Sequence, residues 1–172
     1  VIDRVSGLDR PAEFFITPKA EYLVLPYWRR EVGRLLVMPH VKRVTVQTNL
    51  SFDVAAWLDE IEAGKLALWT TYHPGETELG PLLEKWELLR RRGVPFSVGV
   101  VGTRENIGRA EGLRRLLPAD VYLWVNAYKR EAGYYGQEEL ARLLAIDPLF
   151  ALNDLHYPSL GEPCTAGHRA VY

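Results

Sequence analysis

Polar side chains with useful chemistry follow several apolar segments of this sequence, at the point where each segment ends. Glu21, Asn49, His73, Glu105 and Asn126 each stand at or just after a run rich in β-branched or aromatic residues. A carboxylate accepts hydrogen bonds and binds cations, an amide both donates and accepts, and a histidine ring exchanges protons near neutral pH. Their common position predicts a binding or catalytic site formed by strand ends.

Five short apolar segments must position these side chains. They cover residues 14–21, 44–51, 66–73, 96–105 and 121–129. Short runs of this composition favour strands, and each is followed by apolar residues at three- and four-residue steps, which are typical of amphipathic helices. We expect these helices at residues 22–36, 54–62, 79–92, 106–117 and 138–144, with Gly64 and Gly93 as C-caps.

Repeated βα units predict an α/β fold with a parallel sheet and helices outside it. Residues 96–101 do not alternate, which is typical of a strand covered on both faces. Polar strand ends favour a partial βα (TIM-like) barrel over a doubly wound sheet, a distinction that the pattern alone draws weakly. No glycine-rich phosphate loop of the dinucleotide or P-loop type follows any strand. In a barrel the site lies at the carboxyl ends of the strands.

Composition narrows the classes of function. The formal net charge of −1 gives no reason to expect nucleic acid or an anionic membrane as a partner. The sequence has neither a run of about 20 apolar residues nor a signal-peptide pattern, so we expect a cytoplasmic protein. A single cysteine, Cys164, excludes an internal disulfide. The chain starts at Val1 rather than at methionine, and we expect a fragment, a partial barrel truncated at both ends.

Taken together, the strand ends resemble the core of the radical S-adenosylmethionine (radical SAM) superfamily. TPKAE (17–21) stands where that family has a Gly-Gly-Glu-Pro type motif, and QTNL (47–50) is similar to its Thr-x-Asn-Gly. VGVVGTRE (98–105) corresponds to its G-x-I-x-G-x-x-E without the first glycine. TTYHP (70–74) and LWVN (123–126) stand at the ends of two further strands. The order of these motifs resembles one bacterial subgroup whose substrate is unassigned.

The resemblance implies S-adenosylmethionine as cofactor, cleaved by a [4Fe-4S] cluster to a 5′-deoxyadenosyl radical that abstracts hydrogen from an unknown small molecule or peptide. It also implies a flavodoxin or ferredoxin as reductant. Glu21 would receive the methionine amino group, and Val100 and Gly102 would lie against the adenine. The full set of cofactor-binding residues that it implies is Glu21, Asn49, Thr71, His73, Val100, Gly102, Glu105 and Asn126.

The C-x-x-x-C-x-x-C loop that defines the family is absent from this chain. Without three thiolates there is no cluster that can cleave the cofactor. Either the chain is an internal fragment that lacks the first strand and its loop, or it is a family member that has lost its chemistry. We expect residues 1–145 to form the barrel core. Residues 146–172 would begin a C-terminal extension in which Cys164 is an auxiliary-cluster ligand.

Other interpretations remain open. An ordinary barrel hydrolase would use Glu21, His73 and Glu105 around a divalent metal. Zinc sites commonly have more histidine or cysteine ligands than the one histidine found among these strand ends. A catalytically dead binding module would present the same strand ends to a partner. Structural roles are also open for these residues. Glu21 and Glu105 could each stabilise a helix N-terminus. Asn49 could bond the backbone of its own loop, and the His73-Pro-Gly sequence could simply form a turn. A barrel that lacks its first strand has an unpaired edge, so we expect self-association.

Overall fold

The computed structural model describes residues 5–155 and 161. Its strands are β1 (Ala12–Ile16), β2 (Val41–Thr48), β3 (Leu66–Tyr72), β4 (Phe96–Val101) and β5 (Leu123–Asn126). Its helices are η1 (Tyr22–Val24), α2 (Pro26–Leu36), α3 (Val54–Glu60), η2 (Ala63–Lys65), α4 (Leu79–Arg91), α5 (Arg104–Leu116), α6 (Gln137–Ile146) and α7 (Phe150–Asp154). All five predicted strands are present, and a helix follows each of them.

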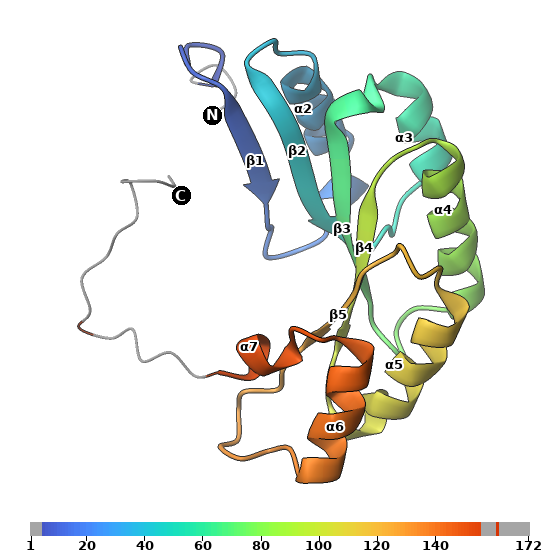
Figure 1. The fold of residues 1–172 in the computed structure, drawn as a ribbon. Coiled ribbons are helices and arrows are strands. Elements are labelled where there is room, and N and C mark those ends of the chain that lie inside the picture. The colour runs from blue at the N-terminus through green and yellow to red at the C-terminus, as the bar shows by residue number, and fades with distance from the viewer. Residues whose placement is uncertain (1–4, 156–160, 162–172) are drawn as a thin grey trace.

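The strands form one five-stranded sheet in the order β1-β2-β3-β4-β5, and every neighbouring pair is parallel. The sheet is open, because β1 and β5 do not pair with each other in the described part of the chain. Figure 1 shows the helices that follow the strands on one side of this twisted sheet. The predicted α/β fold is therefore confirmed, with an arrangement consistent with a partial βα barrel.

Side-chain alternation gives the sheet two different faces. Val44, Val46 and Thr48 of β2 are buried towards the helices, whereas Thr45 and Gln47 between them are only partly buried. Cross-strand register extends both rows through the sheet, so Leu68 and Val98 belong to the helix-facing row. We call the other face the open face.

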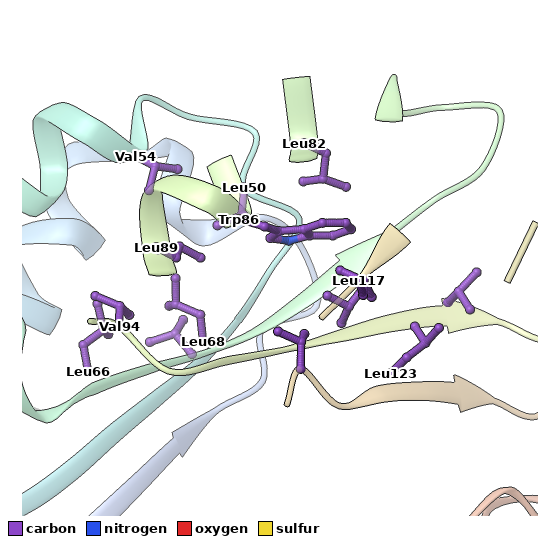
Figure 2. Packing of buried hydrophobic residues seen from close by; sticks show 14 of the residues in the cluster. Leu50, Val54, Leu66, Leu68, Leu82, Trp86, Leu89, Val94, Leu117 and Leu123 are labelled. Carbon is purple, nitrogen blue, oxygen red and sulfur yellow. The ribbon is translucent and has the colours of Figure 1, made fainter. Parts of the chain in front are cut away.

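The main core lies between the helix-facing row and the helices. Figure 2 shows Leu82, Trp86 and Leu89 of α4 above Leu66 and Leu68 of β3. Burying Trp86 requires a partner for its indole N–H, which donates to Thr70 Oγ1 at 3.0 Å. The Thr70 hydroxyl then donates to the carbonyl of Ser97 at 2.8 Å. This chain of hydrogen bonds joins α4, β3 and β4 inside the core.

An aromatic row crosses the open face. The Phe15 ring of β1 stacks on Trp69 of β3 with centroids 4.8 Å apart, and Trp69 meets Trp124 of β5 edge to face at 4.8 Å. Trp124 lies directly over Gly99 of β4, where an added Cβ would come within 2.0 Å of the indole ring. The lack of alternation in β4 is therefore explained on one face by helices and on the other by Trp124. The predicted cover on both faces of β4 is therefore present, and on the open face the Trp124 side chain provides it in place of a helix.

Two local predictions differ from the structure. Helix α3 ends at Glu60 with Ile61 in extended conformation, and Gly64 lies in the 3-10 turn η2 instead of capping the helix. By contrast, Gly93 has φ +67° and follows α4, as a glycine cap requires. Helix α7 was not predicted, because its five residues are too short for a periodic pattern. Residues 170–172, which have the composition of a strand, lie outside the described residues.

The start of the predicted C-terminal extension packs against the end of the sheet at β5. Phe150 has no exposed surface and meets Tyr135 edge to face at 5.2 Å. Asp147, which is 2% exposed, accepts hydrogen bonds from the Tyr122 hydroxyl at 2.5 Å and from the Val125 N–H at 2.9 Å. Residues 147–154 thus belong to the same packed unit as β5.

Substituting Gly99 tests the packing on the open face. We expect Gly99→Ala to lower the free energy of unfolding by about 1–3 kcal/mol, because the new methyl group displaces Trp124. Gly108→Ala is the matched control, since Gly108 is an exposed position in α5 with no atom near its added Cβ. This control should stabilise the protein by about 0.5–1 kcal/mol. Urea unfolding followed by circular dichroism measures both, and equal stability of the two variants would contradict the described position of Trp124.

The Tyr122–Asp147 contact predicts a dependence of stability on alkaline pH. Partial burial, the hydrogen bond to Asp147 and the charge of that carboxylate raise the pKa of Tyr122. A tyrosine with a raised pKa in the folded state contributes stability that is complete below its unfolded pKa of about 10 and is lost as the pH rises above it. We therefore expect Tyr122→Phe to reduce the loss of stability above about pH 10, while Tyr27→Phe, at a half-exposed ring, leaves it unchanged. The urea concentration at the unfolding midpoint is measured for each variant across this pH range. If the midpoint falls equally steeply with pH in both variants, the effect is ruled out.

Candidate functional site

A pocket of about 310 Å³ opens at the carboxyl ends of β1, β2 and β3. We call it the strand-end pocket. Its lining comes from the loops after these strands and from the open face of the sheet: Pro18, Lys19, Ala20, Glu21, Gln47, Thr48, Asn49, Thr71 and His73. Carboxyl ends of parallel strands meet at one edge of the sheet, so residues up to 55 positions apart in the chain share this pocket.

Glu21 is the most heavily bonded side chain of the pocket. Its Oε2 atom accepts hydrogen bonds from the Thr48 hydroxyl at 2.9 Å and from the Asn49 N–H at 2.6 Å. Its Oε1 atom accepts from the Leu23 N–H at 3.1 Å and thereby caps the turn η1. These three donors fix the carboxylate at the rim of the pocket. A carboxylate offers about four lone-pair positions, so Glu21 retains capacity for another donor.

The loop after β2 is shaped by its own side chains. The Thr48 hydroxyl oxygen accepts from the Leu50 N–H at 3.0 Å, and Asn49 Oδ1 accepts from the Ser51 N–H at 3.0 Å. Leu50 is completely buried and has φ +59°, a conformation that is costly for a residue with a side chain. Lys85 of α4 donates to the Leu50 carbonyl at 2.6 Å and stabilises this backbone turn. The interpretation of Asn49 as a loop-bonding residue is therefore confirmed, and its side chain also lines the pocket.

His73 and Thr71 complete the pocket on the β3 side. Thr71 lies in the open-face row, and His73 lines the pocket just beyond the end of the strand. The His73 carbonyl accepts hydrogen bonds from Glu76 and Thr77, both at 3.0 Å, and Gly75 has φ +91°. The His-Pro-Gly sequence therefore makes the turn that it predicts, and His73 also lines the pocket.

Half of the predicted site residues come together here. Glu21, Asn49, Thr71 and His73 line the strand-end pocket. The other four do not line it: Val100 lies on β4, Gly102 in the loop after β4, Glu105 in the first turn of α5 and Asn126 at the end of β5. Cys164, predicted as an auxiliary-cluster ligand, lies outside the described residues.

Val100 lies on the side of the sheet that faces the helices. It pairs with Tyr72 and Val125 in the helix-facing row and is 2% exposed within the hydrophobic core. Strand alternation directs it away from the open face, so its side chain cannot lie against a ring bound there in this register. Gly102 is buried near Val125 and Tyr135, and its N–H donates to the Asn126 carbonyl at 2.9 Å.

Glu105 lies in the first turn of α5 and is exposed. Hydrogen bonds from its own backbone N–H and from the Thr103 hydroxyl hold the pKa of Glu105 below its usual value. These are the properties of a carboxylate that stabilises a helix N-terminus. The helix-capping interpretation of Glu105 therefore agrees with the structure, whereas a ligand contact remains a prediction.

Five lining residues are not among the predicted cofactor-binding residues: Pro18, Lys19, Ala20, Gln47 and Thr48. All five stand within the motifs TPKAE (17–21) and QTNL (47–50). Gln47 could have been found from alternation, because it stands two residues before Asn49 and between the buried Val46 and Thr48. No periodic signal marks Lys19, which reaches the pocket through the turn between β1 and η1.

A second hollow of about 200 Å³ adjoins the strand-end pocket through Asn49. The loops after β2 and β3 and the first turns of α4 form it, with Ser51, Glu76, Glu78 and Lys85 among its polar residues. No group of three histidine, cysteine, aspartate or glutamate side chains in the described part of the chain is arranged to hold a metal ion. A metal-dependent hydrolase site built on Glu21, His73 and Glu105 thus finds no support in the described residues.

Comparison of this chain with protein-family models, curated proteins and solved structures gives no match. None of the described helices has the length and apolar character that crossing a membrane requires. The case for a function therefore depends on the geometry of the strand-end pocket.

The hydrogen bonds of Thr48 generate a prediction. Thr48→Val removes a donor to Glu21 and the acceptor of the buried Leu50 N–H, and we expect the free energy of unfolding to fall by about 1–3 kcal/mol. Thr45→Val is the control, because Thr45 lies on the same strand but faces the open side of the sheet. Thermal and urea unfolding compare the two variants. A loss of stability no larger in Thr48→Val than in the control would mean that the Glu21 contacts contribute little.

Proposed function

We propose that this chain forms the S-adenosylmethionine-binding part of a radical SAM enzyme, with the aminoacyl end of the cofactor in the strand-end pocket. One observation carries the proposal: an acidic residue, Glu21, and a basic residue, Lys19, line the same pocket. The methionine end of the cofactor carries an ammonium and a carboxylate group. A pocket with one charge of each sign complements such a zwitterion.

The arrangement of Glu21 supports the assignment of the ammonium group. Three donors from the chain hold the carboxylate in place, so little side-chain entropy remains to be lost when a ligand binds. A carboxylate held in this way still accepts a further hydrogen bond. In the proposed complex, Glu21 accepts from the ammonium group and Lys19 pairs with the carboxylate, while Thr71 and His73 offer polar contacts to the rest of the ligand.

The iron-sulfur cluster does not fit this chain by itself. A cluster that cleaves the cofactor needs three thiolates, and the sequence contains one cysteine. When bound to such a cluster, the cofactor supplies a radical that abstracts hydrogen. The residues of this chain contribute binding and orientation, and the cluster ligands must come from residues outside this sequence. A binding module without cluster chemistry uses the same pocket in the same way.

Titration calorimetry with three nucleosides tests the proposal. We expect S-adenosylmethionine and S-adenosylhomocysteine to bind, and 5′-methylthioadenosine, which lacks the amino-acid end, to bind at least about tenfold more weakly. Lys19→Met and Glu21→Gln should each weaken binding of S-adenosylhomocysteine by about tenfold or more, because each removes one charge of the pair. Lys42→Met, at an exposed position of β2, is the matched charge control and should leave the affinity unchanged.

Circular dichroism of each variant checks that the fold is retained. Equal affinity for all three nucleosides would show that the amino-acid end is not recognised. Absence of binding to the folded wild-type chain would reject the assignment of this pocket.

A further inference from the structure

The two edges of the sheet differ in whether their outward backbone N–H groups have hydrogen-bond partners in the described part of the chain. At β5, the outward Val125 N–H donates to Asp147 Oδ2 at 2.9 Å, and the Ala127 N–H just beyond the strand donates to Asn153 Oδ1 at 3.0 Å. Both acceptors are side chains from the segment 147–154, which lies against this edge. An additional strand cannot pair here without displacing them, so this edge of the sheet is closed.

The outer edge of β1 has no such cover in the described part of the chain. Strand β2 is the only neighbour of β1 there. The Ala12 N–H donates to the His40 carbonyl on the β2 side at 3.0 Å. The register shifts by one residue between Ala12 and Glu13, but the extra residue, Lys42, is on β2, and burial alternates without interruption along β1. Backbone alternation along β1 therefore directs the N–H groups of Glu13 and Phe15 outward. An edge strand with free donors and acceptors is a template for pairing with another strand.

The side chains at this edge add an apolar surface. Phe15 is 50% exposed although one face of its ring stacks on Trp69. Strand β1 contains no proline and no lysine, and Glu13 is its single charged residue. Protective features that proteins commonly place on edge strands are therefore nearly absent from β1.

We propose that the outer edge of β1 is an interface between two copies of this chain, with the two β1 strands antiparallel and Phe14 on the twofold axis. In this register Glu13 of each copy lies opposite Phe15 of the other copy. Both residues direct their N–H and C=O groups outward, so each such pair exchanges its backbone hydrogen bonds. The two sheets join with their open faces on the same side.

Charge favours this orientation over a parallel one. Before Phe14, residues 9–13 contain Asp9 and Glu13 against Arg10, and therefore carry one net negative charge. After it, residues 15–20 contain Lys19 as their single charged residue. Antiparallel strands place the negative end of one copy beside the positive end of the other, whereas parallel strands place like charges together. A register shifted to put Glu13 opposite Glu13 brings two carboxylates together.

Sedimentation velocity over a range of concentrations tests the interface. We expect a reversible dimer for the wild-type chain and at least about a tenfold higher dissociation constant for Glu13→Pro, which removes an outward N–H and leaves the β1–β2 bonds in place. Glu13→Ala keeps the N–H and should dimerise at least as well as the wild type. Val37→Ser removes an exposed apolar residue elsewhere, at 61% exposure, and should have no effect.

Disulfide trapping tests the register. In a Cys164→Ser background, a mixture of Glu13→Cys and Phe15→Cys chains should form a cross-linked dimer on mild oxidation, because these positions are opposite each other. Either variant alone should form much less, since its cysteines then lie on diagonal positions. Cross-linking that is strongest within a single variant would show another register and overturn the proposed pairing.

A chain that stays monomeric at all accessible concentrations would overturn the interface itself, as would a dimer that is equally stable in Glu13→Pro. Circular dichroism spectra of the variants confirm that each is folded. The interface does not depend on the proposed cofactor binding, because neither Glu13 nor Phe15 lines the strand-end pocket. The calorimetric and sedimentation results can therefore fail separately.

Discussion

The hydrogen bonds of the Glu21 carboxylate determine the geometry of the candidate site. They join the turn after β1 to the end of β2, two segments whose bonded residues are 27 and 28 positions apart in the chain. Because Thr48 also accepts from the Leu50 N–H, the same contacts hold the β2–α3 loop in its left-handed turn. Strand β2 contributes Gln47 and Thr48 to the pocket, and Thr48 is itself a donor to Glu21. A rearrangement at Glu21 would therefore move the part of the rim formed by the loops after β1 and β2.

The difference between the two faces of the sheet explains where a site can exist at all. Helices and buried aliphatic residues fill the helix-facing side, so polar side chains there, such as Thr70, are fully bonded inside the core. The open face carries Phe15, Trp69 and Trp124 in place of a helix layer. The indole N–H groups of Trp69 and Trp124 are buried without a partner in the described part of the chain, which makes this face the less satisfied one.

Much of the architecture could be predicted from the sequence because local composition is decisive in short parallel strands. Residues 44–48 and 96–101 have the β-branched and apolar composition of strands. Helices such as α4 show apolar residues at three- and four-residue steps. The structure brought Glu21, Asn49, Thr71 and His73 together because strand ends converge by topology. The bonding of Glu21 to Thr48 could not be predicted, since it depends on the register of two strands. The motif alignment could not show on which face Val100 lies, whereas counting alternate residues from the buried Val98 places it in the helix-facing row.

The order of strands in the sheet has a consequence for how the protein is made. Each strand pairs with the next one in the chain, and paired residues are about 22 to 30 positions apart throughout. Each strand finds its pairing partner in the next βα unit of the chain. The sheet can therefore grow one βα unit at a time as the chain leaves the ribosome. The last step is the arrival of residues 147–154, which covers the edge of β5. Synthesis from the N-terminus thus exposes each new edge only until the following unit arrives.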